Sequence, residues 1–203
     1  MNIKFTPNRT AKILLVIVLF IIIAIAYKKR KKLKKTAMNT INYIKQKTWD
    51  IYSNRRIDTL HPDIRAKTKE FIIRAEKELG IKLRVTSALR TWQEQNRLYK
   101  KGRSAPGKRV TNAKAGESYH NYGLAFDVVE IKNGKALWNN PNWQKIGNLG
   151  KSLGFEWGGD WKQVKDKQDK DKPHFQKRFG KHHTTLAKLY KSGQRKGNYI
   201  LLS

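Results

Sequence analysis

Hydrophobic and polar positions begin to follow regular periods at about Ile57, where the pattern of a folded domain starts. His61 and Pro62 open a predicted helix, because proline suits the first helical turn, and Gly80 ends it. Apolar residues mark one face of this helix: Ile64, Phe71, Ile72, Ala75 and Leu79. Apolar and polar residues then alternate over residues 81–86, which predicts a half-buried strand.

The same features, namely apolar periodicity, helix-capping residues and glycine at helix ends, predict the remaining elements. They are a second helix opened by a capping box and ended by glycine (91–102), a strand (124–131), a third helix (140–154) and a short strand (155–157). Residues 100–115 and the Lys/Asp-rich residues 162–172 are expected to be loops, and the first of these to be mobile. Interleaved helices and strands with short connections indicate an α+β fold with a small antiparallel sheet flanked by helices.

A different apolar pattern lies near the N-terminus, where residues 13–26 form an unbroken apolar run. With Ala11, Lys12 and Tyr27 the stretch is 17 residues long, the lower limit for a helix that crosses a bilayer. The run is followed at once by basic residues, which favours one N-terminal transmembrane helix. A signal peptide cleaved after Ala26 is the alternative, and it would make the protein secreted.

These patterns divide the chain into three expected parts. They are an N-terminal anchor or signal peptide with basic flanks (1–35), a basic stem or linker (36–56) and a globular domain with a basic C-terminal tail (57–203).

The formal net charge of +30 is concentrated toward both ends of the chain. Residues 1–49 hold 12 Lys or Arg and no acid, and residues 181–203 hold five and no acid. A protein surface with such an excess of positive charge favours polyanionic partners such as nucleic acid, anionic lipid or acidic wall polymers. The chain has no cysteine, so a disulfide or a thiolate zinc site is excluded and any metal must be held by His and carboxylate side chains.

Two histidines and one aspartate, His120, Asp127 and His174, are candidate metal ligands. A zinc ion held by three protein ligands keeps one position open for water, as in hydrolases. On a continuous helix His120 and Asp127 would lie about 10 Å apart along the axis, so Gly123 is expected to break the segment and Asp127 to return on a strand. Asp171, three residues before His174, is a candidate general base.

Each of these residues taken singly has an ordinary explanation. A lone buried histidine is usually a core residue, and Asp171 lies in a segment with Asp166, Asp169 and many lysines. The other histidines (His61, His182 and His183) lack a comparable setting and are expected at the surface.

The residues around the candidate ligands form three motifs in a fixed order: S-x-H-x-x-G-x-A-x-D at 118–127, G-F-E-W-G-G-D-W at 154–161 and D-x-P-H-F at 171–175. Together they resemble the M15 metallopeptidases, the D-alanyl-D-alanine carboxypeptidase family that includes VanY-type enzymes and phage L-alanyl-D-glutamate endopeptidases. The resemblance covers about residues 57–180. It implies a Hedgehog/DD-peptidase-like α+β fold.

The resemblance also implies the roles of the site residues. His120, Asp127 and His174 would bind Zn²⁺, Asp171 would be the base, and Arg90 would stabilise the oxyanion; Ser118 and Gln176 are the expected substrate-binding residues. An aspartate at 171 is similar to the endopeptidase branch, since the carboxypeptidase branch usually has glutamate within E-x-W-H. The segment Ser87-Ala88-Leu89-Arg90 departs from the family's S-G-Y-R, which alters the local substrate wall.

The function implied is zinc-dependent hydrolysis of peptidoglycan stem peptides by a monomer. We expect an L-alanyl-D-glutamate-type endopeptidase, with a D-alanyl-D-alanine carboxypeptidase as the alternative. The catalytic domain would then be membrane-anchored on the periplasmic or extracellular side, although the Lys/Arg cluster after the apolar run favours the cytoplasmic side.

An alternative of another class is a membrane-anchored protein that binds nucleic acid or a wall polymer. The sequence has no helix-turn-helix, zinc-finger or RNP pattern, so no specific nucleic acid partner is expected.

Overall fold

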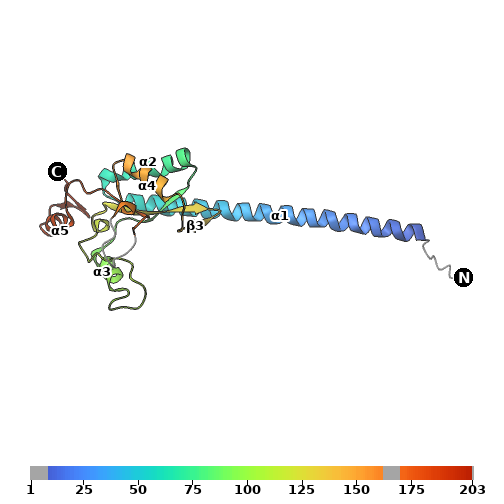
Figure 1. The fold of residues 1–203 in the computed structure, drawn as a ribbon, viewed down its shortest axis with the longest axis horizontal. Helices are drawn as coiled ribbons and strands as arrows, with labels where there is room; N and C mark the ends of the chain where they lie inside the picture. The colour runs from blue at the N-terminus through green and yellow to red at the C-terminus, as the bar shows by residue number, and fades with distance from the viewer. Residues whose placement is uncertain (1–8, 162–169, 203) are drawn as a thin grey trace. The chain divides into compact units, whose positions relative to one another are not determined.

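The computed structural model describes residues 9–161 and 170–202, and the chain divides into two compact units, Met1–Lys45 and Gln46–Ser203. Its elements (Figure 1) follow in this order: α1 (Arg9–Asp58), α2 (Pro62–Leu79), β1 (Leu83–Ser87), α3 (Trp92–Lys100), the 3₁₀ turn η1 (Tyr119–Tyr122), β2 (Ala125–Lys132), β3 (Lys135–Leu137), α4 (Trp143–Ser152), β4 (Glu156–Trp157), η2 (Gly158–Asp160), β5 (His174–Gln176), α5 (His183–Lys191), β6 (Arg195–Lys196) and β7 (Tyr199–Ile200).

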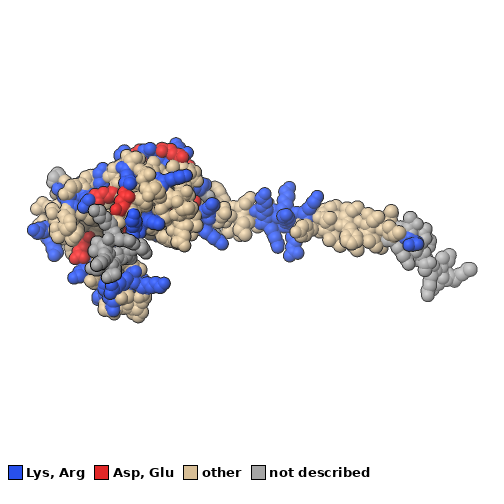
Figure 2. Space-filling model, in the orientation of Figure 1, with Lys and Arg blue, Asp and Glu red and all other residues tan. Residues whose placement is uncertain are grey.

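The first unit contains the N-terminal part of α1, and it corrects one expectation. Within the described residues, no helix carries an apolar stretch long enough to cross a bilayer. The apolar residues 13–26 are followed in the same helix by the basic residues 28–32, whose side chains gather around α1 in Figure 2. The apolar run is therefore shorter than the ~20 residues that a span needs. The predicted transmembrane helix, and the membrane-anchored localisation that rested on it, are wrong.

In the described part of the second unit, an antiparallel sheet has the order β1-β2-β5-β4, with β3 paired to the end of β2. Strands β2 and β3 are joined by the two-residue turn Asn133-Gly134, and both residues have positive φ (52° and 70°). Asn-Gly is the preferred sequence for such a tight hairpin turn because both residues tolerate positive φ. The predicted small antiparallel sheet is thus confirmed, with β3 as an additional strand.

Helices α2 and α4 supply much of the apolar core of this unit. Phe71 of α2 contacts three phenylalanines of the sheet region (Phe126, Phe155 and Phe175), with ring centroids 4.8 to 6.5 Å apart. Such tilted aromatic pairs are favourable beyond the area that they bury. Gly147 and Gly150 of α4 face the rings of Trp157 and Phe175, where an added Cβ would overlap the ring. Glycine at both positions therefore lets α4 lie close to β4 and β5.

The C-terminal residues fold onto a second apolar cluster. Leu186 of α5 and Ile200 of β7 are buried together with Tyr122 and Leu124. His61, expected at the surface, is buried here: its Nδ1 accepts a hydrogen bond from the backbone of Asp63, and its Nε2 donates to the carbonyl oxygen of Ile200 (3.0 Å). The sequence pattern showed no sign of this contact because its partners are 139 residues apart.

The predicted elements 61–80, 81–86, 91–102, 124–131, 140–154 and 155–157 all have a counterpart in the structure, with ends that differ by a few residues. Gly80 ends α2 in the left-handed conformation (φ 67°), as its position predicts. Of the predicted loop 162–172, residues 162–169 lie outside the described residues.

Candidate metal centre

The pairing of β2 with β5 brings two of the candidate ligands together. Asp127 of β2 and His174 of β5 are directly opposite each other in the antiparallel register. Residues that face each other across such a pair project on the same side of the sheet. The register therefore places the carboxylate and the imidazole within direct reach.

The third candidate, His120, lies on η1 just before β2. The hydroxyl of Ser118 accepts a hydrogen bond from the His120 backbone N–H (3.3 Å) and caps the turn. Gly123 ends it in the left-handed conformation (φ 67°), and an added Cβ there would lie 2.7 Å from the backbone nitrogen of His61. Glycine is thus required twice at this position, for its φ and for the close backbone contact. The break predicted between His120 and Asp127 is confirmed.

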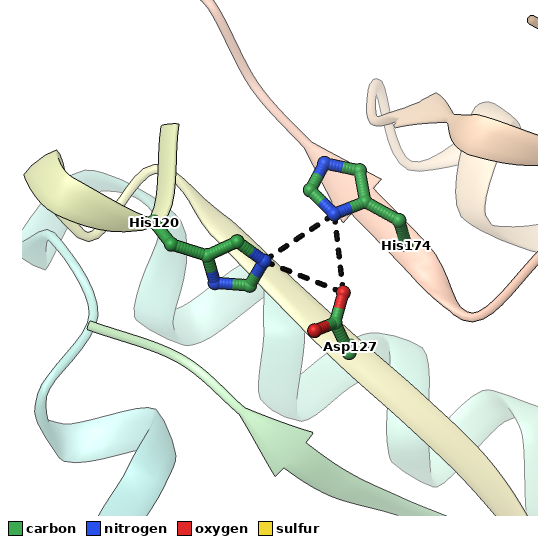
Figure 3. Close-up of side chains that lie close together, drawn as sticks. All are labelled: His120, Asp127 and His174. Carbon is green, nitrogen blue, oxygen red and sulfur yellow. Dashed lines mark hydrogen bonds and ion pairs between the residues drawn. The ribbon is translucent and has the colours of Figure 1, made fainter. Parts of the chain in front are cut away.

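The three side chains form a triangle of donor atoms (Figure 3). Oδ1 of Asp127 lies 3.1 Å from Nδ1 of His174 and 3.3 Å from Nε2 of His120, and the two ring nitrogens are 3.3 Å apart. Ligand atoms around a tetrahedral zinc ion with bonds of about 2.0–2.1 Å are about 3.3 Å apart by simple geometry. The spacing of the triangle fits three ligands of one such ion.

The outer nitrogen of each imidazole is held by an acceptor. Nδ1 of His120 donates to the carbonyl oxygen of Ala88 (2.7 Å), and Nε2 of His174 donates to Oε1 of Gln176 (3.0 Å). These bonds assign one proton to each outer nitrogen, so both inner nitrogens present lone pairs toward Oδ1 of Asp127. Three acceptors that face one another at this distance repel each other unless a proton or a cation lies between them. The chemistry of the donor set therefore fits a metal ion.

The pKa shifts of Asp127 and His174 reflect the close contact between the carboxylate and the two imidazoles. Burial alone would raise the pKa of Asp127, but when the imidazoles are also protonated at their inner nitrogens, the charge of His120 and the hydrogen bonds from both rings lower this pKa well below its ordinary value. Burial would lower the pKa of His174, but the hydrogen bond and charge of Asp127 raise it overall. A permanent negative charge is thus paired with two nearly buried imidazoles, whose side chains are 3% and 8% exposed.

Behind His174, a chain of hydrogen bonds leads away from the centre. The amide nitrogen of Gln176 donates to Oε2 of Glu156 (3.1 Å), whose Oε1 accepts from Nε of Arg178 (2.7 Å). Gln176 and Glu156 are opposite each other in the β4–β5 register. Sequence reasoning missed Glu156, although its place in the 154–161 motif, directly before the buried Trp157, was the available signal.

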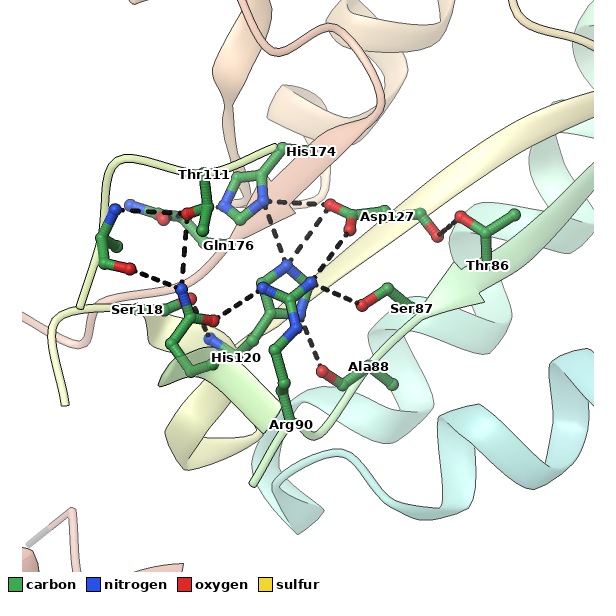
Figure 4. Close-up of polar contacts among 12 residues, drawn as sticks. Thr86, Ser87, Ala88, Arg90, Thr111, Ser118, His120, Asp127, His174 and Gln176 are labelled. Atoms are coloured by element: carbon green, nitrogen blue, oxygen red, sulfur yellow. Dashed lines mark hydrogen bonds and ion pairs between the residues drawn. The ribbon is translucent and has the colours of Figure 1, made fainter. Parts of the chain in front are cut away.

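Arg90 lies beside the centre (Figure 4). Its Nη2 is 3.8 Å from Oδ2 of Asp127 and donates to Oγ of Ser87 (3.0 Å), and its Nη1 donates to Oε1 of Gln95 (2.8 Å). The guanidinium has five N–H donors, so part of its donor capacity is not used by these partners.

Gln95 is a further residue that sequence reasoning missed. It is fully buried, and its amide nitrogen donates to the carbonyl oxygen of Ala113 (2.7 Å) and to Oγ1 of Thr111 (3.3 Å). Within the predicted mobile loop 100–115, Arg103 also donates to the carbonyl oxygens of Tyr99 and Thr111. The loop is thus tied to Arg90 and to α3 by side-chain hydrogen bonds.

Asp171 lies on the loop that leads into β5, and two residues of the 154–161 motif hold its backbone. The indole N–H of Trp157 donates to the carbonyl oxygen of Lys172 (2.7 Å), and an added Cβ on Gly158 would overlap the carbonyl oxygen of Asp171. Desolvation raises the pKa of the Asp171 carboxyl, although much of the side chain is exposed, and the charge of Asp127 raises it further. Asp171 therefore lies within electrostatic reach of the triangle.

An aromatic wall borders the same centre. The ring of Trp161 lies 5.0 Å from that of His174, measured between centroids, and the indole is 42% exposed. The structure thus brings together His120, Asp127, His174, Arg90 and Asp171. Ser118 is bonded to the backbone of His120, and Gln176 is bonded to the ring of His174.

Comparison with known proteins gives consistent matches. A family profile described as D-alanyl-D-alanine carboxypeptidase matches residues 111–177, a range that contains the triangle and Asp171. The peptidoglycan L-alanyl-D-glutamate endopeptidase CwlK of Bacillus subtilis (strain 168) is 42% identical over 117 residues, 53% of this chain and 70% of that protein.

Two solved structures are also similar. The L-Ala D-Glu endopeptidase ChiX of Serratia marcescens has 28% identity and a TM-score of 0.43, over 63% of this chain and 86% of that one. The LD-carboxypeptidase LdcB has 21% identity and a TM-score of 0.45, over 70% of this chain and 80% of that one.

Proposed function

This chain belongs to the M15 peptidase family, and on that basis we propose that it is a zinc-dependent peptidase that hydrolyses peptidoglycan stem peptides, cutting the L-alanyl-D-glutamate bond. The observation that carries the proposal is the triangle of donor atoms, with edges of 3.1 to 3.3 Å. Two imidazoles, one carboxylate and an open fourth position are typical of catalytic zinc.

His120, Asp127 and His174 would hold the ion. When bound, zinc supplies a Lewis acid that polarises a carbonyl group and lowers the pKa of water to about 7. Asp171 accepts a proton from the attacking water while the water oxygen forms a bond to the scissile carbonyl carbon. The same carboxyl then gives the proton to the leaving nitrogen as the C–N bond breaks. Desolvation raises the pKa of Asp171 in the metal-free protein, which favours the protonated carboxyl that the second step requires.

Arg90 contributes positive charge next to the reacting carbonyl. Its contacts with Ser87 and Gln95 fix the guanidinium, and the N–H groups that these partners leave unused can donate to the oxyanion. We assign Ser118 and Gln176 positioning roles in place of the substrate contacts expected from the sequence. Each is already bonded to a histidine of the triangle, Ser118 through the backbone of His120 and Gln176 through the ring of His174.

The endopeptidase activity is favoured over the carboxypeptidase activity by two observations. The 42% identical relative is named as an L-alanyl-D-glutamate endopeptidase, and the base position carries aspartate in D-x-P-H-F. The matching family profile is described as a D-alanyl-D-alanine carboxypeptidase, so both bonds belong in the test.

The test is mass spectrometry of muropeptides after digestion of purified sacculi by the protein, with and without a chelator. We expect fragments with a new glutamate amino terminus, lost with chelator, restored by zinc and absent with Asp171→Ala. Release of free D-alanine alone would assign the carboxypeptidase activity. Full activity of a correctly folded, zinc-loaded Asp171→Ala variant would refute the role of the base.

A further inference from the structure

A cleft of about 630 Å³ is lined in part by the residues on either side of Asp171. It is lined by residues of the β3–α4 connection and of the segment that precedes β5: Trp138, Asn139, Asn140, Pro141, Trp143, Lys170, Lys172 and Pro173. None of these residues belongs to the metal centre, and the proposed mechanism uses none of them. The cleft thus needs an explanation of its own.

Several polar groups of the lining are already bonded within the protein. The amide nitrogen of Asn140 donates to Oε2 of Glu130 (2.6 Å), and its amide oxygen accepts from the backbone of Asn142 (2.8 Å). The indole N–H of Trp143 donates to the carbonyl oxygen of Trp138 (3.2 Å). These bonds build the wall of the cleft and leave little capacity there to bind a ligand through hydrogen bonds.

The exposed lining residues that could contact a ligand through a charge, an amide or an aromatic ring are Lys170, Lys172, Asn139 and Trp138. Lys170 and Lys172 are exposed and have no ion-pair partner within residues 9–161 and 170–202. The indole of Trp138 is 54% exposed, a large fraction for a tryptophan in a cleft wall. Two cations beside an aromatic face favour an organic anion over a neutral ligand.

The cleft is next to the metal centre along the chain. Asp171, the proposed base, lies between Lys170 and Lys172, and Pro173 of the cleft precedes the ligand His174. Consecutive Cα atoms are 3.8 Å apart, so a chain molecule of a few residues can reach from the cleft to the triangle. The backbone of Lys172 is fixed by the indole N–H of Trp157, which holds this side of the cleft in place.

We propose that this cleft is a substrate subsite that binds a carboxylate-bearing part of the stem peptide next to the scissile bond. The proposal rests on the proposed function, since it takes the peptide as the substrate. Lys170 and Lys172 bind the carboxylate, and Trp138 packs against the adjoining aliphatic part. The glycan strand of the same substrate is the other possible occupant, but a neutral sugar leaves both ammonium groups without a partner.

The experiment compares two synthetic stem peptides that differ only in whether the carboxylates outside the scissile bond are free or amidated. KM and kcat are measured for the wild type, Lys170→Gln, Lys172→Gln and Trp138→Ala. Lys77→Gln on α2 is the matched control, because that lysine is exposed and far from the cleft in the sequence. The lysine substitutions keep the backbone carbonyl that Trp157 binds.

We expect the wild type to have the lower KM for the free carboxylate. Each cleft lysine substitution should raise that KM about two- to fivefold, as for one exposed ion pair, with kcat and the KM for the amidated peptide unchanged. Trp138→Ala should raise KM for both peptides, and Lys77→Gln should change neither.

Two outcomes would overturn the subsite. One is equal KM values for the two peptides in the wild type together with no effect of either lysine substitution. The other is an effect of Trp138→Ala only on substrates that carry the disaccharide, which would make the cleft a sugar site. Failure of the proposed function is distinct, because the wild type would then cut neither peptide.

Discussion

Asp127 and His174 face each other across the β2–β5 pair, with Oδ1 and Nδ1 only 3.1 Å apart. Register is what produces this contact, because a shift of one residue would turn one of the two side chains to the opposite face of the sheet. The triangle of candidate ligands therefore depends on the pairing of these two strands. His120 completes it from a turn that Gly123 fixes.

Asp127→Asn should abolish stoichiometric zinc binding, since a neutral amide is a poor zinc ligand in place of a carboxylate. The substitution keeps the shape of the side chain, so the sheet should form as before. Metal analysis together with circular dichroism checks both statements. A variant that retains one zinc ion per chain would exclude Asp127 as a ligand.

Gln176→Leu should weaken zinc binding about 10- to 100-fold, the usual cost of removing a residue that orients a ligand. The reason is that Nε2 of His174 loses its acceptor, so the ring is no longer held in one orientation. Competition with a chelator measures the affinity. Activity should return at high zinc concentration, whereas a direct substrate-binding role would leave zinc affinity unchanged and raise KM.

Gln95→Leu should lower kcat about tenfold or more while the zinc content stays at one per chain. The buried amide is the acceptor for Nη1 of Arg90 and the donor to Ala113, and the loss of both bonds frees the guanidinium. Gln95→Glu keeps an acceptor for Arg90 and should recover part of kcat. Equal loss in both variants would point to a purely structural role.

Gly158→Ala should lower kcat by up to about 100-fold through displacement of Asp171, because an added Cβ overlaps the carbonyl oxygen of that residue. The triangle is not touched, so zinc affinity should be unchanged. Gly180→Ala separates overlap from backbone strain, because an added Cβ there meets no atom within 4 Å while its φ of 69° is strained for alanine. Unchanged kcat in a folded Gly158→Ala variant would show that the loop position is not critical.

Zinc affinity should fall as the pH falls, beginning above the range of an ordinary imidazole. The pKa of His174 is raised in the metal-free protein, so protons compete with zinc for Nδ1 already at pH values above about 6.5. Titration of zinc binding at several pH values measures this. An affinity that is constant down to pH 6 would contradict it.

The stability of the metal-free protein should also depend on pH, and the contribution of His174 to it changes in the opposite sense to the zinc affinity. A raised folded pKa of His174 contributes stability that is full below the unfolded pKa of about 6.5 and is lost as the pH rises through the folded value. The lowered pKa of Asp127 contributes stability above about pH 3.9 that is lost in acid. Thermal unfolding of apo and zinc-loaded protein should therefore converge as the pH falls and diverge as it rises.

The sequence was sufficient to predict those element boundaries that depend on neighbouring residues in the chain. Pro62 and Gly80 delimit α2, and Gly123 separates His120 from the strand of Asp127 as predicted. The three candidate ligands could be selected from the sequence because each lies within a motif of several residues.

The errors come from interactions that a local pattern does not contain. The apolar run 13–26 was extended over its flanks to reach the length of a membrane span, and within the described residues no helix qualifies. His61 was assigned to the surface because Ile200, the partner that covers it, is far along the chain. Gln95 and Glu156 were missed because their importance lies in what they bind across the fold.

The separation of the ligands along the chain has a consequence for synthesis. Asp127 and His174 are 47 residues apart, and β4, which pairs with β5, comes between them. A nascent chain that has emerged only through β4 carries His120 and Asp127 but lacks the third donor. If the proposed ligand set is correct, hydrolysis requires β5, so the activity is expected to begin only after β5 has left the ribosome and joined the sheet.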